Sequence, residues 1–568
     1  MAEDQKINQF RKSENFPVAS FLIPKHAREP ILALYQFARS ADEISDDHTL
    51  SNDVRKTRLL EIYNGFLSGD INKIPYPARD YYRFALNGTY NIKHGLALLE
   101  AFIQDTDKKI YKNWAETLGY CRRSAATIGR HVLEATNEFA ADVSLSDNIC
   151  TVLQLINHLQ DLKADYMNDG RCYFDTSFFP DCSEIIAEKE SESINKGKLE
   201  VISELKEMLN SSKSIVSSIS SIRVRCEISV ICEVAALLLK KLEVNDILTS
   251  RVQLTKPEKI KALLFGIAKA IFVLPKLSRK ASSIAFKSRS SFLKPMLRLD
   301  KERRRAILCF YSFCRLVDDA ADDCTDVEKA VENINFWKDE LEKIYSDKVM
   351  YLPTHPISRE LELHVKKYGV EKKYLEEIIA GQEMDISGQM LRPSNDVFDT
   401  YCYRVASCVG LASVKIFGYK EKNSVKIENF AASLGKALQI INIIRDVKED
   451  ARKGRIYIPK SLLEEVGHPL VTPEQIYDDY DRFEVELEPA LKKLGEIADF
   501  NFNRAMKSLP VRERYNMRPA LLMKKIYQKY LEKMREYHFI FERDEISLTL
   551  KEKFKIFYLD PYEPVRKI

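Results

Sequence analysis

The sequence predicts an all-α protein made of two consecutive helical halves. Long segments place apolar residues at three- and four-residue spacing, with little of the alternation that marks strands. Only 18 glycines occur among 568 residues, so positions that interrupt helices are few. A set of motifs also occurs twice in the same order, which indicates two copies of one helical domain.

The duplication rests on three pairs of segments. Residues 34–47, "LYQFARSADEISDD", recur without a gap as "FYSFCRLVDDAADD" at 310–323. Residues 120–129 and 401–410 share Tyr, Cys, Arg, Ala and Gly in register, and "QLINHLQDLKAD" at 154–165 recurs as "QIINIIRDVKED" at 439–450. The period is far longer than that of solenoid repeats, so we expect one domain over 1–273 and a second over 274–568.

Between the helical segments, breaker-rich stretches mark the loops in chain order. We expect them at 69–80, 169–184, 351–358 and 452–459, and the junction of the halves near 274–291. The junction is basic and partly apolar, with Lys276, Arg279 and Lys280 beside Leu277 and Phe286. Contact with an anionic membrane surface and an ordinary solvated linker are both consistent with this pattern.

Composition narrows the function classes. A net charge of +4 is too balanced to indicate a nucleic-acid partner. Eleven cysteines, an odd number in apolar contexts and without short metal spacing, predict reduced thiols and no zinc site. The polar N-terminus lacks the apolar core of a signal peptide, and the apolar run at 262–275 is short and contains Lys269. We expect a cytoplasmic protein, with membrane contact limited to the inner face of a membrane.

The aspartate clusters carry the chemistry. Asp318 and Asp322 lie one helical turn apart and repel each other, which a solvated acidic face tolerates. The preceding "AILCFYSFC" at 306–314 is nearly all apolar, however, as in a buried helix. Carboxylates at the end of a buried helix require cations, and Mg²⁺ commonly joins one or two carboxylates to substrate phosphates. Asp446 and Asp450 supply a second pair, so the pattern indicates a diphosphate site.

At these residues the sequence resembles the squalene and phytoene synthase family, all-α head-to-head prenyl transferases with the isoprenoid-synthase bundle, over both halves. The resemblance implies metal ligands at Asp42, Asp46, Asp161 and Asp165 in the first half and at Asp318, Asp322, Asp446 and Asp450 in the second. It implies catalytic roles for Tyr35, Arg39, Tyr120, Tyr173, Arg315, Tyr401, Arg445 and Tyr457. It implies substrate contacts for Gln154, Asn157, Arg171, Ser291, Tyr311, Gln439, Asn442, Arg455 and Tyr527.

The same resemblance implies Mg²⁺ as cofactor, about three ions per active half. NAD(P)H is not expected, because no Gly-x-Gly-x-x-Gly segment occurs. The opening "ENFPVASFLIP" at 14–24 is similar to hydroxysqualene synthases, and 290–315 is similar to presqualene diphosphate synthases. The resulting hypothesis is a bifunctional enzyme. Its C-terminal half joins two farnesyl diphosphates into presqualene diphosphate, and its N-terminal half converts that product to hydroxysqualene by water capture.

The halves differ at two motif positions, where Glu43 replaces Asp319 and Gln160 replaces Arg445. We therefore expect the first half to lack a cation beside its second motif and to bind a less charged substrate. Three alternatives stay open: squalene, dehydrosqualene or phytoene synthesis, one inactive half, or a non-enzymatic assembly factor. A downstream reductase or cyclase is the partner class that such a product implies.

Overall fold

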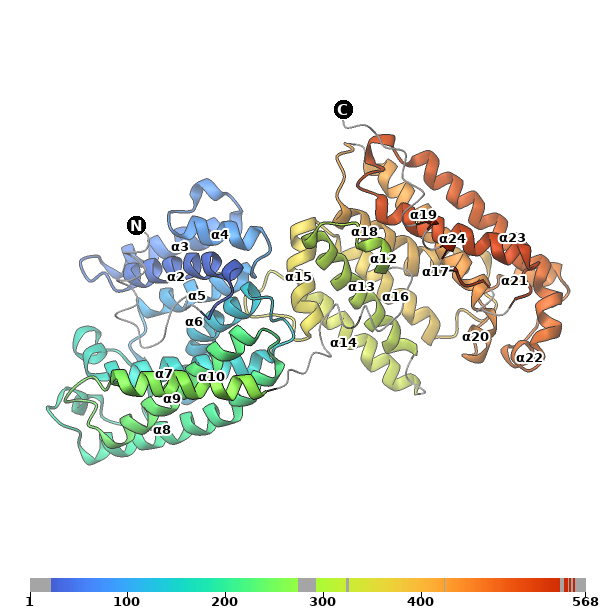
Figure 1. The fold of residues 1–568 in the computed structure, drawn as a ribbon. Helices are drawn as coiled ribbons and strands as arrows, with labels where there is room; N and C mark the ends of the chain where they lie inside the picture. Colours follow the sequence, from blue (N-terminus) through green and yellow to red (C-terminus); the bar gives the residue numbers. More distant parts are fainter. Residues whose placement is uncertain are drawn as a thin grey trace. The chain divides into compact units, whose positions relative to one another are not determined.

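The structure is a computed structural model that describes residues 22–273, 284, 293–322, 326–422, 424–541, 546–549, 551–552 and 555–556. The chain forms two compact units (Figure 1). The first unit comprises Met1–Lys280 with Asp347–Leu352, and the second comprises Ala281–Ser346 with Pro353–Ile568. The predicted all-α class is confirmed, because the described residues hold a single two-stranded parallel pair, β1 (Ile110–Tyr111) with β2 (Cys172–Asp175).

The helices of each unit follow in chain order. Those of the first unit are α2 (Lys25–Ser45), α3 (Asn52–Ser68), η1 (Ile71–Lys73), α4 (Ala78–Leu86), α5 (Ile92–Asp105), α6 (Trp114–Ala135), α7 (Val143–Asp169), η2 (Cys182–Ile186), α8 (Glu192–Ser212), η3 (Lys213–Ser218), α9 (Ile222–Val244) and α10 (Lys256–Phe272). Those of the second are α12 (Leu293–Met296), α13 (Lys301–Asp322), α14 (Val327–Tyr345), α15 (Pro356–Tyr368), α16 (Lys372–Ile386), α17 (Asn395–Cys402), the π-helical η4 (Tyr403–Ser407), α18 (Cys408–Phe417), α19 (Ser424–Arg445), α20 (Val447–Arg452), α21 (Lys460–Glu465), α22 (Pro473–Asp478), α23 (Tyr480–Ser508), η5 (Val511–Glu513) and α24 (Arg518–Glu536).

In the first unit, helix α7 carries Asp161 and Asp165, and burial of its apolar residues fixes how the helix is oriented. Leu155, Leu159 and Leu162 recur at helical spacing and are buried in the core that α7 shares with α6, α8 and α9. The Asp142 side chain caps the first turn by accepting from the amides of Ser144 and Leu145. The helix ends at Gly170 in the left-handed conformation, which leads directly into Arg171.

In the second unit, two glycines let helices approach closely beside the site. A Cβ on Gly435 of α19 would lie 2.4 Å from the carbonyl oxygen of Ala406, and one on Gly410 would lie 2.6 Å from that of Ala431. The backbone that approaches Gly435 is the π-helical turn of η4, a local widening that occurs frequently at functional sites, and Gly410 of α18 is approached by α19. α19 also packs along α23 (Figure 1).

The remaining sequence predictions concern cysteines and membrane spans. All ten cysteines in the described part of the chain are free thiols. None of the described helices combines the length and apolar character needed to cross a membrane. The basic junction at 274–291 lies almost wholly outside the described residues, as do Ser291 and Asp323.

Candidate active site

The first aspartate motif of the second unit lies at the end of α13 and is neutralised by three cations. Arg315 Nη1 lies 2.8 Å from Asp318 Oδ2, and its Nη2 lies 2.7 Å from Asp319 Oδ1. The two oxygens of Asp322 accept from Lys453 Nζ at 2.6 Å and Arg455 Nη1 at 2.7 Å. The segment after α20, which carries both of these cations, therefore joins the second motif to the first.

The second motif lies where α19 gives way to α20. Arg445 donates two parallel bonds to Asp446, Nε to Oδ1 at 2.8 Å and Nη2 to Oδ2 at 2.6 Å. Asp450 remains one turn further on, because its amide donates to the Asp446 carbonyl at 2.8 Å. The two aspartates are therefore one helical turn apart even though α19 itself ends at Arg445.

The pKa values show how burial and neighbouring charges act on the carboxylates of the two motifs. Burial, with repulsion from Asp322, raises the pKa of Asp318 to about 6. Burial and the neighbouring Asp446 raise the pKa of Asp450 well above its ordinary value. Burial would also raise the pKa of Asp322, but the bonds from Lys453 and Arg455 outweigh it and the pKa falls. Clustered carboxylates that, in addition to burial, raise the pKa of Asp318 and Asp450 by mutual repulsion offer the oxygen ligands that Mg²⁺ prefers.

A buried aspartate that the motifs did not single out completes this cluster. Asp385 of α16 accepts from the hydroxyls of Tyr401 at 3.0 Å and Tyr457 at 2.8 Å. Burial raises its pKa to about 6, and Arg455 Nε lies 3.9 Å from its carboxylate. The two tyrosine rings stack with centroids 5.1 Å apart. Asp385 thus fixes two predicted catalytic tyrosines beside the aspartates.

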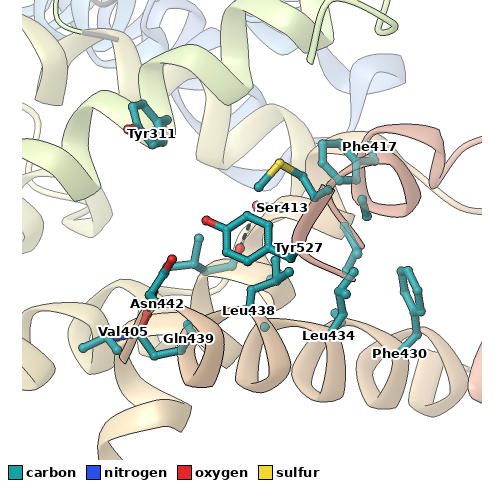
Figure 2. A pocket seen from close by; sticks show the side chains of 18 of the residues that line it. Tyr311, Val405, Ser413, Phe417, Phe430, Leu434, Leu438, Gln439, Asn442 and Tyr527 are labelled. Atoms are coloured by element: carbon teal, nitrogen blue, oxygen red, sulfur yellow. Dashed lines mark hydrogen bonds between the residues drawn. The ribbon is translucent and has the colours of Figure 1, made fainter. Parts of the chain in front are cut away.

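A cavity of about 250 Å³ is lined by residues of α13, α18, α19 and α24. Its apolar part is formed by Val405, Val409, Phe417, Phe430, Leu434 and Leu438, among others. Tyr311, Gln439, Asn442 and Tyr527 line it as well, and Figure 2 shows Gln439 and Asn442 at the opposite end from Phe430. Asn442 stands one turn before Asp446 on the same helix face, so one end of the apolar cavity leads to the second motif.

The first unit repeats this arrangement on α2 and α7. Arg39 bonds Asp42 and Glu43, each at 3.1 Å, as Arg315 bonds its two aspartates. Arg171 Nη1 lies 3.7 Å from Asp46, and burial raises the Asp46 pKa, with Asp169 and Asp165 adding to the effect. Asp165 of the second motif therefore lies close enough to act on the first.

The first unit also contains a counterpart of Asp385. Tyr120 donates to Asp105 at 2.7 Å, and Arg171 donates to the Asp105 carbonyl at 2.9 Å and to the Tyr173 hydroxyl at 3.0 Å. Burial raises the Asp105 pKa to about 7. Asp105 and Asp385 are 280 residues apart, within the spacing of the repeated motifs. This shared spacing is the one signal in the sequence that pairs Asp105 with Asp385, because the residues next to them are not identical in the two halves.

The predicted loss of a cation beside the second motif of the first unit is wrong. Arg251, in the loop between α9 and α10, bonds Asp161 through Nε at 2.6 Å and Nη2 at 2.8 Å. The paired geometry is that of Arg445 with Asp446. Gln160 is buried and donates to the Val252 carbonyl instead. Alignment of the motifs missed this because the guanidinium comes from a residue 90 positions away in sequence.

Two other substitutions do change the site. Aligning the Gly-Arg pair that follows each second motif places Asp169 opposite Lys453, and Asp169 Oδ1 lies 2.8 Å from His48 Nε2. Aligning the second motifs places His158 opposite Ile443. The His158 ring stacks on Tyr173 at 3.7 Å and bonds Gln154 at 3.2 Å. The predicted residues Tyr35 and Asn157 are half-buried on α2 and α7.

A separate polar cluster lies in the second unit, where ligand atoms of Cys309, Glu360 and His364 fall within 4.8 Å of one another. Arg305 Nε donates to Glu360 Oε1 at 2.6 Å, and the Cys309 thiol donates to the Ile357 carbonyl at 3.6 Å. Glu360 is the single carboxylate of this cluster and already bonds Arg305, so we assign no metal to it.

Comparison with known proteins matches both units to one family. The squalene/phytoene synthase family model covers residues 10–258 and again 286–552. A presqualene diphosphate synthase of Rhodopseudomonas palustris is 36% identical over 190 residues, which are 34% of this chain and 65% of that protein. A hydroxysqualene synthase of Sinorhizobium fredii is 35% identical over a region that covers 45% of this chain and 87% of that protein. A presqualene diphosphate synthase of the same organism is 31% identical over a region that covers 46% of this chain and 88% of that protein.

Proposed function

The chain belongs to the squalene/phytoene synthase family and is a head-to-head prenyl transferase, and on that premise we propose that its two units catalyse consecutive steps. The second unit condenses two farnesyl diphosphates to presqualene diphosphate. The first unit ionises that product and lets water capture the carbocation, which gives hydroxysqualene. The observation that carries the proposal is that both units retain two aspartate motifs with a guanidinium on each motif.

In the second unit, the chain's own groups bind and orient the diphosphates. Arg315, Arg445 and Arg455 lie on the aspartate oxygens and can each share their remaining N–H groups with phosphate. Mg²⁺ held by Asp318, Asp322, Asp446 and Asp450 would supply the positive charge that stabilises diphosphate as it leaves. The apolar walls of the 250 Å³ cavity exclude water from the prenyl chains.

In the first unit, two substitutions support a substrate with a single diphosphate and a reaction with water. The reversal from Lys453 to Asp169 removes the cation that bonds Asp322 in the second unit. Two farnesyl diphosphates carry two diphosphate groups, whereas presqualene diphosphate carries one. His158 places an imidazole where Ile443 is apolar; its Nε2 bonds Gln154 at 3.2 Å and its Nδ1 lies 3.9 Å from Asp165, so this unit is more polar at that position.

The direct test is incubation of the whole chain with farnesyl diphosphate and Mg²⁺, without nicotinamide, followed by mass identification of the products. Hydroxysqualene is the expected product, and omission of Mg²⁺ should abolish it. Squalene that forms only after addition of NADPH, dehydrosqualene, or phytoene from geranylgeranyl diphosphate would each replace the proposal with the corresponding single synthase. Lack of turnover with every substrate would favour an assembly-factor role.

We also propose that α10 rests on the surface of an anionic membrane, where the apolar product would accumulate. Its small residues Ala262, Gly266 and Ala270 are buried on one face. Its large apolar residues are exposed: Ile260, Leu264, Phe265, Ile271 and Phe272, the last at 86%. Lys256, Lys259 and Lys261 are exposed on the same helix. This combination of apolar and basic side chains is typical of interfacial helices.

Co-sedimentation with phosphatidylglycerol vesicles tests this contact. Leu264→Ser with Ile271→Ser should release the chain from the vesicles, while the matched change Leu86→Ser, at an exposed leucine of α4, should not. Equal binding by both variants, or equal binding to uncharged phosphatidylcholine, would contradict it.

A further inference from the structure

We infer that Gln160 is a positioning residue that holds Arg251 on Asp161, so that a loop arginine replaces the helix arginine of the second unit. The inference rests on the proposed function, because it treats the Asp161 carboxylate as part of a Mg²⁺–diphosphate site. It concerns the loop between α9 and α10, residues 245–254, which we call the arginine loop.

The far end of the arginine loop is anchored by Gln160. The side chain of Gln160 leaves α7 one residue before Asp161 and is 4% exposed. Its Nε2 donates to the backbone carbonyl of Val252, the residue that follows Arg251. One α7 segment therefore holds both the backbone of the loop, through Gln160, and the guanidinium, through Asp161.

The near end of the loop is anchored on α8. Lys198 is 2% exposed and donates to Glu190 at 2.6 Å and to the Asn245 carbonyl at 2.9 Å. Glu190 in turn accepts from the Ile247 amide at 2.6 Å, and its own amide donates to Asp246 at 3.0 Å. The loop is thus fixed before and after Arg251 by polar contacts that are buried or partly buried.

Apolar contacts also hold four residues of the arginine loop. The side chains of Ile247, Leu248, Val252 and Leu254 are buried in the core of the first unit. Asn245, Thr249, Ser250 and Gln253 are exposed. Arg251 is exposed over 36% of its side chain and points to Asp161. Val252, the buried residue next to Arg251, restricts the backbone at this point, so loss of the Gln160 bond would act on Arg251 through the backbone of Val252.

This arrangement gives the Arg-to-Gln difference between the motifs a physical meaning. In the second unit, the residue before Asp446, the first aspartate of the second motif, supplies the guanidinium itself, since Arg445 bonds Asp446. In the first unit, the equivalent residue supplies an amide that places a guanidinium from elsewhere. An arginine at 160 would bring a second guanidinium next to Arg251, and the two like charges would repel each other.

The experiment is a double-mutant cycle on the whole chain, with binding of inorganic pyrophosphate in the presence of Mg²⁺ as the readout. Asp446→Ala with Asp450→Ala silences the second unit in every sample, so that the titration reports the first. Gln160→Met keeps the length of the side chain and removes its donor. We expect Gln160→Met to weaken binding about 10-fold, and Arg251→Gln to weaken it at least as much.

The decisive comparison is the combination. If Gln160 acts through Arg251, Gln160→Met should have almost no further effect in the Arg251→Gln background. Gln160→Leu serves as a second variant if Gln160→Met fails to fold. Unchanged binding by Gln160→Met, or losses that multiply in the double variant, would overturn the inference. Absence of pyrophosphate binding before any change at 160 or 251 would overturn the proposed function of this unit and the inference with it.

Discussion

Replacement of Arg445 by glutamine is expected to slow the consumption of farnesyl diphosphate by about 30- to 1,000-fold. Arg445 makes two bonds to Asp446, at 2.8 and 2.6 Å, and both side chains are only 18% exposed. Truncation of one partner of such a pair costs about 2 to 4 kcal/mol, and each 1.4 kcal/mol of barrier is about tenfold in rate. Arg445→Lys keeps the charge but not the paired hydrogen bonds, so its rate should lie between those of the unchanged chain and of Arg445→Gln.

The corresponding change in the first unit is Arg251→Gln, measured on supplied presqualene diphosphate. The Arg251–Asp161 pair is more exposed, at 36% and 34%, so solvent weakens it and we expect a smaller loss of about 5- to 30-fold. Each variant should leave the other unit's reaction unchanged, which serves as the control for folding. A near-silent Arg445→Gln, or a loss that appears in the other unit's reaction, would refute the reasoning.

The remaining predictions separate the units and test their charges. Asp318→Ala with Asp322→Ala should abolish condensation of farnesyl diphosphate and spare conversion of supplied presqualene diphosphate; continued condensation would contradict the assignment. Asp161→Ala with Asp165→Ala should make presqualene diphosphate accumulate, and normal hydroxysqualene formation would reverse the order of the units. Lys453→Ala removes a cation from Asp322 and should raise KM for farnesyl diphosphate several-fold, whereas the matched exposed lysine change Lys460→Ala should not. Asp105 has its pKa raised by burial from 3.8 to about 7, so it holds its proton more tightly in the folded than in the unfolded chain. In metal-free buffer the free energy of unfolding should therefore fall as pH rises through this range, and Asp105→Asn should reduce the fall; urea unfolding at pH 5 and pH 8 measures it, and a steeper fall in the variant would contradict the account.

The sequence alone was sufficient to predict the helical fold class, the duplication of the domain and the positions of the aspartate motifs. These features are local: helical periodicity and the stacking of Asp318 on Asp322 depend on residues within a few turns of each other. The Gly-Arg-x-Tyr segments are local as well, and the structure brings Arg455 to Asp322 and Tyr457 to Asp385. Aligning two copies inside one chain also exposed their differences at Glu43 and Gln160.

Only the tertiary structure decided what those differences mean. Arg251 reaches Asp161 from a separate loop, and Asp105 and Asp385 reach their tyrosines from neighbouring helices. Charge balance in a site depends on distance in space, because a guanidinium acts over a few ångströms whatever its position in sequence. The sequence therefore showed that Arg445 is absent from the first unit, whereas the fold showed that Arg251 replaces it. Among the described residues, Lys453 bonds Asp322, and the residue aligned with it, Asp169, bonds His48.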